Sequence, residues 1–284
     1  MRRPTTPEIR LVALDLDGTL LDPDKRVSSR TEAALRRAAA AGAEIVPASG
    51  RYYGAFPDQV RQLDFVRYVI AVNGAEVLDL RTGETLYAAE IPLETALRIM
   101  EHLDTAGVPY DCYMGGRGWM TEAVQNRAAE YAWDEHALDL ILRRRTPVPE
   151  LKAFLRERGR DVQKIQFFSN DREKRTALAA ELARRFPEAV LTSSIPNNVE
   201  INAPGADKGS ALRALAARLG IPRDATMAFG DALNDMSMIT AAGIGVAMGN
   251  ADEALKAAAD HITAGCAEDG VALAVESFCL QEGR

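Results

Sequence analysis

Short apolar runs separated by segments of helical periodicity occupy both ends of the chain. In the first part we expect strands at 9–14, 44–48 and 68–72, with a helix from Ser28 or Ser29 to about Ala41. In the last part we expect helices at 207–219, 234–241 and 251–259, with strands at 226–229 and 244–247. Short buried strands that alternate with helices predict a parallel sheet with both faces covered.

The middle of the chain has a different pattern. We expect a polar-edged hairpin at 77–89, helices at 93–105 and 171–186, and an alternating strand at 162–168. Alternation of polar and apolar residues predicts an antiparallel sheet with one polar face. The sequence therefore predicts an α/β protein in which an α+β domain at 89–203 is inserted into a core made of 1–88 and 204–284.

Length and composition narrow the class of protein. The 284 residues, 47% of them hydrophobic, suffice for one large or two moderate domains with a substantial core. The net charge of −7 disfavours a nucleic acid or a membrane surface as partner. Three cysteines and three scattered histidines predict neither a disulfide framework nor a histidine zinc site. Because the N-terminus lacks an apolar signal core and no apolar run could span a bilayer, we expect a soluble cytoplasmic protein, as a monomer or homodimer.

Two aspartates one residue apart are the strongest chemical signal. Asp15 and Asp17 follow the first predicted strand, and Gly18 and Thr19 then turn the chain. Because side chains alternate along a strand, both carboxylates leave it on the same side. Two like charges this close require a cation or a shared proton. The pair therefore predicts a metal site, or a nucleophilic carboxylate beside a second one that carries a proton.

Four further groups follow predicted elements at the edge where parallel sheets bind ligands. Ser49, Gly50 and Arg51 follow the second strand at an expected helix start, and Asn73 follows the third strand. Lys208 begins a predicted helix, and Asp231, Asn234 and Asp235 follow the strand at 226–229. Together these residues supply a hydroxyl, an ammonium group, backbone N–H donors and carboxylates, and the carboxylates suit Mg²⁺. This set of groups indicates phosphoryl transfer.

In these residues the chain resembles the haloacid dehalogenase superfamily, and within it the Cof-type phosphatases of subgroup IIB, which carry an α/β cap. Asp15–Thr19 match the first motif of that family, Ser49 the second, Lys208 the third and Gly230–Asp235 the fourth. The segment 243–251 is also similar to that subgroup. The resemblance implies a Rossmann-like core, an inserted cap that selects the substrate, and a Mg²⁺-dependent phosphatase acting on small phosphorylated metabolites, such as sugar or cofactor phosphates.

The resemblance also implies a role for each matching residue. Asp15 would attack phosphorus and form an aspartyl-phosphate, and Asp17 would protonate the leaving oxygen and later activate water. Ser49 and Lys208 would bind the phosphoryl group, and the further binding positions would be Gly18, Gly50, Arg51, Asn73 and Asn234. Mg²⁺ would be held by Asp15, the carbonyl of Asp17 and Asp231, with Asp235 acting directly or through water. Since the metal and Lys208 would lower the pKa of Asp15 selectively, we expect Asp15 to be ionised while Asp17 is protonated.

Several alternatives stay open. A phosphomutase, or a non-catalytic protein that binds a phosphorylated metabolite, would carry a similar set of residues. Asn234 and Asp235 also suit helix caps, and Arg51 and Asn73 also suit loop braces. The basic run 143–145 is either a solvated face or part of the mouth of the cap. The glycine-rich segment 113–119 is either a flexible loop over the site or a hairpin turn.

Overall fold

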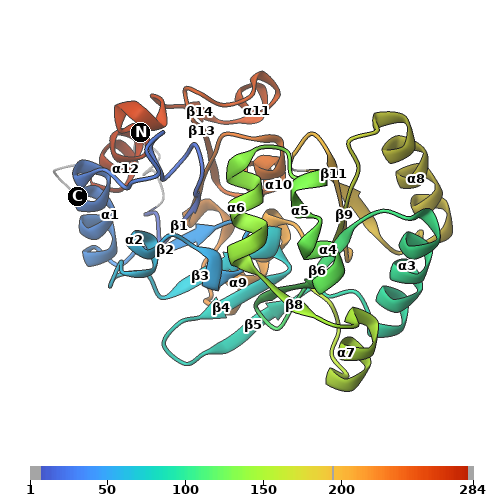
Figure 1. Cartoon of the computed structure of the whole chain (residues 1–284). Coiled ribbons are helices and arrows are strands. Elements are labelled where there is room, and N and C mark those ends of the chain that lie inside the picture. The colour runs from blue at the N-terminus through green and yellow to red at the C-terminus, as the bar shows by residue number, and fades with distance from the viewer. Residues whose placement is uncertain (1–7, 194, 281–284) are drawn as a thin grey trace. The chain divides into compact units, whose positions relative to one another are not determined.

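The computed structural model describes residues 8–193 and 195–280, and these residues divide into two compact units. The first unit contains residues 8–51, 56–88 and 207–280. The second unit contains residues 52–55 and 89–206, apart from position 194. Figure 1 shows the ribbon with its elements labelled. In the described part of the chain, each unit is organised around one sheet.

The sheet of the first unit is mostly parallel. Its strands are β1 (Leu11–Asp15), β2 (Glu44–Ala48), β3 (Tyr68–Ala71), β4 (Glu76–Asp79), β5 (Glu84–Ala88), β12 (Thr226–Gly230), β13 (Ile244–Ala247) and β14 (His261–Ile262). Among the described residues their order is β14-β13-β12-β1-β2-β3-β4-β5. Neighbours from β14 to β3 are parallel, and β4 and β5 form an antiparallel hairpin at one edge. The predicted α/β fold with a parallel sheet is confirmed.

The described part of the first unit has six α-helices, of which four lie close to the predicted positions and two, at 58–61 and 270–279, were not predicted. They are α1 (Ser29–Ala40), α2 (Asp58–Arg61), α9 (Lys208–Arg218), α10 (Met236–Ala241), α11 (Glu253–Ala258) and α12 (Gly270–Cys279). Helix α1 packs against α12, and α9 packs against α10. Ser28 caps α1, because its hydroxyl accepts the backbone N–H of Thr31 at 3.0 Å. Every residue of β1 is buried, which explains why its sequence is a continuous apolar run.

The second unit combines a mixed sheet with six helices among its described residues. Its strands are β6 (Tyr110–Met114), β7 (Arg117–Thr121), β8 (Arg145–Val148), β9 (Lys164–Phe168), β10 (Val190–Thr192) and β11 (Asn198–Asn202). Its helices are α3 (Leu93–Ala106), α4 (Glu122–Asn126), α5 (Ala128–Tyr131), α6 (Glu135–Arg144), α7 (Leu151–Arg158) and α8 (Arg172–Arg185). The strand order is β10-β11-β9-β6-β7-β8. The predicted antiparallel pairing is confirmed except for β7 and β8, which are parallel.

The two faces of this second sheet differ, as the alternation in sequence predicts. One face carries Cys112, Ile165 and Ile201 and forms an apolar core with residues of α3, α7 and α8. The alternate residues on the same strands, such as Lys164 and Glu200, are polar and belong to the opposite face. We call this opposite surface the polar face.

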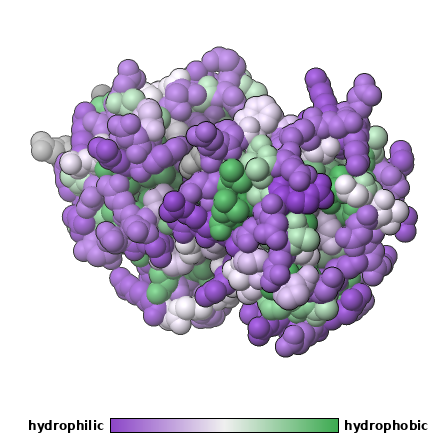
Figure 2. Space-filling view, viewed as in Figure 1, coloured by the Kyte–Doolittle hydropathy of each residue, from purple (hydrophilic) through white to green (hydrophobic). Residues whose placement is uncertain are grey.

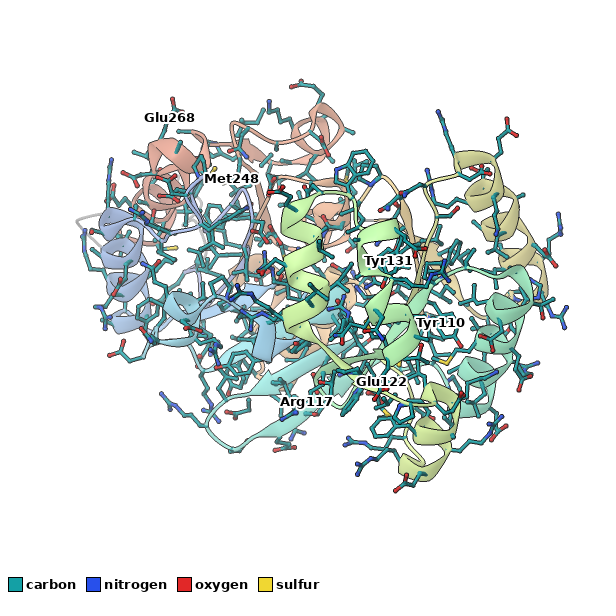
Figure 3. All side chains as sticks on the ribbon, viewed as in Figure 1. Tyr110, Arg117, Glu122, Tyr131, Met248 and Glu268 are labelled. Atoms are coloured by element: carbon teal, nitrogen blue, oxygen red, sulfur yellow. The ribbon has the colours of Figure 1, made fainter. Side chains whose placement is uncertain are left out.

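Two sequence features of the second unit are now assigned. Residues 113–119 form the β6–β7 hairpin, whose turn residues Gly115 and Gly116 have φ of 61° and 69°. Figure 3 labels Tyr110 on β6 and Arg117 on β7. The basic run is not a uniform solvated face. Arg143 is exposed and pairs with Asp139, whereas Arg145 is nearly buried in a pair with Asp111.

The surface is mostly hydrophilic in the view of Figure 2, with an apolar strip over α6, where Leu142 is 50% exposed. Within residues 8–193 and 195–280, no helix has the combined length and apolar character that a membrane span requires.

Candidate active site

Asp15 stands at the end of β1, where a tight turn begins. The backbone N–H of Leu20 donates to the carbonyl oxygen of Asp15 at 3.2 Å, and that of Leu21 donates to Leu16 at 2.8 Å. Gly18 in this turn has φ of 85°, and a Cβ added to it would collide with the carboxylate of Asp231. The turn therefore needs glycine for its backbone and for its close approach to a second acidic residue.

Lys208 is the buried cation of the site. It is the first residue of α9, whose cap Asp207 accepts the backbone N–H of Ser210 at 2.8 Å. Its ammonium group is fully buried and donates to Asp15 and, at 2.5 Å, to Asp235. Burial works against the charged form of Lys208, but Asp15 and Asp235 outweigh it and raise its pKa. Lys208 therefore remains an ammonium that joins the ends of two loops.

Both carboxylate oxygens of Asp235 accept hydrogen bonds from other residues of the chain. Its Oδ1 accepts from Lys208, and its Oδ2 accepts the backbone N–H groups of Asp231 at 3.0 Å and Ala232 at 3.1 Å. These bonds hold the loop after β12, and Asp235 does not cap α10 with its side chain. Asp231 is held from the other side, because the hydroxyl of Thr19 donates to it at 2.8 Å. Asp235 thus shapes the loop that presents Asp231.

Three carboxylates in this site can hold a hard cation. One carboxylate oxygen from each of Asp15, Asp231 and Asp235 lies within 4.8 Å of the other two. Burial raises the pKa of Asp15 to about 7 and that of Asp231 to about 6. When all three are ionised, the cluster carries three negative charges against the single positive charge of Lys208. Oxygen donors with a negative excess suit Mg²⁺, so the residues present fit the predicted metal.

Asp17 has a different environment from the one predicted. Its carboxylate accepts from Arg51 at 2.7 Å and from Lys25 at 2.9 Å. Burial alone would raise the pKa of Asp17, but Arg51 and Lys25 outweigh it and hold it below its usual value. The predicted order, in which Mg²⁺ and Lys208 keep Asp15 ionised beside protonated Asp17, stays a prediction, because the groups of the chain alone raise the pKa of Asp15 and lower that of Asp17. Burial of Asp15 outweighs Lys208, and the two cations beside Asp17 escaped the sequence reasoning.

The loop after β2 brings the remaining predicted residues together. The backbone N–H of Asn73 donates to the carbonyl of Ser49 at 2.9 Å, and the amide of Asn234 donates to that of Asn73 at 3.4 Å. A Cβ on Gly50 would lie 2.9 Å from Asn73 Oδ1. The expected helix start at Ser49 is wrong, because the chain continues into a 3₁₀ turn at Tyr53–Ala55 before α2.

Three further contacts of the site come from residues that were not predicted to belong to it. They are the hydrogen bond of Thr19 to Asp231, the ion pair of Lys25 with Asp17, and the bond that Asn250 donates to the carbonyl of Gly18 at 2.8 Å. Thr19 and Asn250 stand inside the motifs that carry the family resemblance, so a signal for them existed. Lys25 stands in a turn with no such signal.

Comparison with known proteins gives consistent matches over nearly the whole chain. The family model of the haloacid dehalogenase-like hydrolases matches residues 12–275. The 5-amino-6-(5-phospho-D-ribitylamino)uracil phosphatase YcsE of Bacillus subtilis is 30% identical, over 96% of this chain and 97% of its own length. An HMP-PP phosphatase of Serratia proteamaculans is 34% identical, over 87% of this chain and 86% of its own.

Solved structures give the same picture. A haloacid dehalogenase-like hydrolase from Bacteroides thetaiotaomicron superposes with a TM-score of 0.81 at 32% identity, covering 95% of this chain and all of its own. The subclass IIB sugar phosphatase BT4131 superposes with a TM-score of 0.76 at 26% identity, covering 96% of this chain and 100% of its own.

Proposed function

The chain belongs to the haloacid dehalogenase-like hydrolase family, and from this premise we propose how its buried carboxylates hydrolyse phosphate monoesters. Like its relatives it is a phosphatase. The observation that carries the proposal is the buried cluster in which Lys208 joins Asp15 and Asp235 beside Asp231. Such a cluster places a fixed nucleophile beside positive charge, as in-line phosphoryl transfer requires.

In the first step, an oxygen of Asp15 attacks phosphorus and the ester bond to the leaving oxygen breaks. Lys208 holds the other side of that carboxylate and offsets the charge of the phosphoryl group. Ser49 supplies a hydroxyl, Gly50 a backbone N–H and Asn73 its side-chain amide for the phosphoryl oxygens. Asp17 must enter this step protonated, although Arg51 and Lys25 lower its pKa, and it gives its proton to the leaving oxygen, so that an alcohol departs and an aspartyl-phosphate remains.

In the second step, Asp17 takes a proton from water, and the resulting hydroxide attacks phosphorus. The bond between Asp15 and phosphorus breaks, inorganic phosphate leaves, and both aspartates return to their starting states. Asp15, the backbone carbonyl of Asp17 and Asp231 would hold Mg²⁺, while Asp235 and Thr19 orient Asp231. When bound, this ion supplies positive charge for the phosphoryl oxygens.

The leaving group would be a small metabolite such as a sugar or a cofactor. Three similar proteins support a leaving group of this size. Two relatives are named as phosphatases of a phosphoribitylamino-uracil and of HMP-PP, and a structural neighbour is named as a sugar phosphatase. The inserted position of residues 89–206 supports a role of the second unit as the cap that selects the substrate.

Phosphate release tests the function. Purified protein should release phosphate from p-nitrophenyl phosphate with Mg²⁺ and lose this activity in EDTA. Asp15→Asn should lower kcat by at least about 10³-fold, because it removes the nucleophile and keeps the shape of the side chain. Residual turnover near the wild-type value would contradict the role of Asp15.

The same assay separates hydrolysis from a mutase reaction. A phosphatase releases free phosphate without an added sugar bisphosphate, because water receives the phosphoryl group. Phosphate release that required such an activator would favour the mutase instead.

A further inference from the structure

Three consecutive residues after β3 have positive φ. Val72, Asn73 and Gly74 have φ of 51°, 54° and 97°, and we call these three residues the left-handed turn. This region is unfavourable for residues with a side chain, because Cβ comes too close to the following carbonyl oxygen, and it is least favourable for a β-branched residue. Among the described residues, Val72 is the only β-branched residue with positive φ. Its surroundings must therefore hold it in this conformation.

The left-handed turn holds the loop that carries Ser49. The backbone N–H of Asn73 donates to the carbonyl of Ser49, and that of Val72 donates to the carbonyl of Arg51, both at 2.9 Å. The backbone N–H of Ser49 donates in turn to the carbonyl of Ile70 at 2.9 Å. Residues 70–73 therefore fix the backbone of Ser49 through both its N–H and its carbonyl. Two of the three donors belong to the left-handed turn, so their direction depends on its backbone conformation.

The left-handed turn also lies against the start of α9. A Cβ on Gly74 would collide with the carbonyl oxygen of Asp207 and would lie 2.8 Å from the backbone nitrogen of Lys208. Only glycine permits this close approach together with the positive φ of Gly74. The turn therefore contacts both the loop of Ser49 and the residue that presents the buried ammonium group.

The side chain of Asn73 contacts two further parts of the site. Its Oδ1 would lie 2.9 Å from a Cβ on Gly50, and it accepts from the amide of Asn234 at 3.4 Å. Asn73 is also one of the proposed ligands of the phosphoryl group. Because asparagine adopts positive φ more readily than most residues, the conformation of Asn73 itself is unremarkable, whereas that of Val72 requires a cause.

Burial of the Val72 side chain supplies this cause. The side chain is 0% exposed, and burial of an isopropyl group is favourable. A return of the backbone to negative φ would redirect this group out of its buried position. The side chain therefore anchors the backbone in a conformation that the backbone by itself disfavours.

We propose that Val72 is a positioning residue for phosphoryl transfer, because its buried side chain holds the left-handed turn that aligns Ser49 and Asn73 for the phosphoryl group. This inference rests on the proposed phosphatase function and extends it to a residue that acts only through its neighbours. Activity then depends on the left-handed conformation of the backbone at Val72, and not on the volume of its side chain alone.

Two substitutions in the full chain separate backbone conformation from packing. Val72→Ala removes the anchor but keeps Cβ, so the backbone should return to negative φ. With p-nitrophenyl phosphate and Mg²⁺, its kcat should fall and the inhibition constant of inorganic phosphate should rise, each by at least about tenfold. Val72→Gly removes more volume, but glycine adopts positive φ without a steric cost, so its kcat should exceed that of Val72→Ala by at least about threefold. A kcat of Val72→Gly equal to or below that of Val72→Ala would overturn the proposal.

Val69→Ala is the matched control. Val69 belongs to β3, is 1% exposed and is not among the described residues with positive φ, so the same atoms are lost from a buried position with ordinary backbone. Its kcat and phosphate inhibition constant should stay within about threefold of the wild-type values. A merely structural role of Val72 would lower the free energy of unfolding of both alanine variants and leave kcat and phosphate inhibition unchanged, and this result would overturn the proposal.

A second pair of variants decides if Val72→Ala does not fold. Asn73→Gly and Asn73→Ala both remove the carboxamide, at a position that is only partly buried, but only glycine keeps positive φ without a steric cost. The kcat of Asn73→Ala should therefore lie at least about threefold below that of Asn73→Gly, and equal values would overturn the proposal. Failure of the wild-type protein to hydrolyse p-nitrophenyl phosphate with Mg²⁺ would instead contradict the phosphatase function itself, so the two failures are distinguishable.

Discussion

Replacing Lys208 with methionine tests the buried charge cluster most directly. Lys208 is fully buried and donates to both Asp15 and Asp235. The methionine retains most of the side-chain volume, so the variant changes charge more than packing. It removes the cation that these two carboxylates share, with Asp231 close by.

The expected loss is large and depends on pH. Removing one partner of a buried ion pair costs about 3–5 kcal/mol of folding free energy. Burial raises the pKa of Asp15 to about 7, above its ordinary value of 3.8, and loss of Lys208 raises it further. A group with a raised folded pKa binds more protons when folded, so it destabilises the fold increasingly as pH rises from about 4 through that pKa. The variant should therefore lose more stability at pH 8 than at pH 5.

Urea unfolding followed by circular dichroism in EDTA measures this difference. Lys256→Met is the control, because Lys256 belongs to the same unit and pairs at 2.9 Å with an exposed Glu253, a contact worth less than about 1 kcal/mol. Equal free energies of unfolding for the two variants at pH 8 would refute the reasoning. A greater loss at pH 5 than at pH 8 would refute it as well.

Three further predictions concern neighbouring groups. In urea unfolding, Gly18→Ala should lose at least about 1 kcal/mol more free energy of unfolding than Gly83→Ala. Both glycines have positive φ, but only Gly18 lies against Asp231. Equal losses would exclude the steric contact. Arg51→Met should move the titration of the Asp17 carboxyl, followed by ¹³C NMR, to higher pH, since Lys25 alone then opposes burial. An unmoved titration would show that the Arg51 pair has no influence. Mg²⁺ should raise the melting temperature at pH 8, and less so in Asp231→Asn, whereas identical shifts would place the cation elsewhere.

The sequence was sufficient for the positions of Asp15, Asp17 and Lys208 because local signals fix them. An apolar run followed by Gly18 defines the end of β1, and the N-terminus of α9 falls at Lys208 as expected. These features depend on backbone propensity and burial, which are encoded over a few neighbouring residues. The parallel sheet follows from the same local pattern, repeated at both ends of the chain.

Local sequence signals did not predict which side chains of distant loops contact one another. The pairing of Asp17 with Arg51 and the three hydrogen bonds of the Asp235 carboxylate depend on rotamers and on the approach of separate loops. Short elements of the second unit were also missed. Strand β8 contains Pro147, which disfavours a strand in sequence and is tolerated here because β8 lies at the edge of its sheet.

The charge count of the site links its stability to its chemistry. Asp15, Asp231 and Asp235 face one ammonium, that of Lys208, and burial keeps solvent from screening the excess. Burial raises the pKa of Asp15 to about 7 and that of Asp231 to about 6, and the neighbouring carboxylates add to the effect. A bound cation competes with the protons that these carboxylates would otherwise take up, so metal affinity must rise with pH over the same range. Burial therefore has two effects on the cluster. It makes the ionised carboxylates unfavourable when no cation is bound, and it strengthens their attraction for a cation that then binds a phosphoryl group.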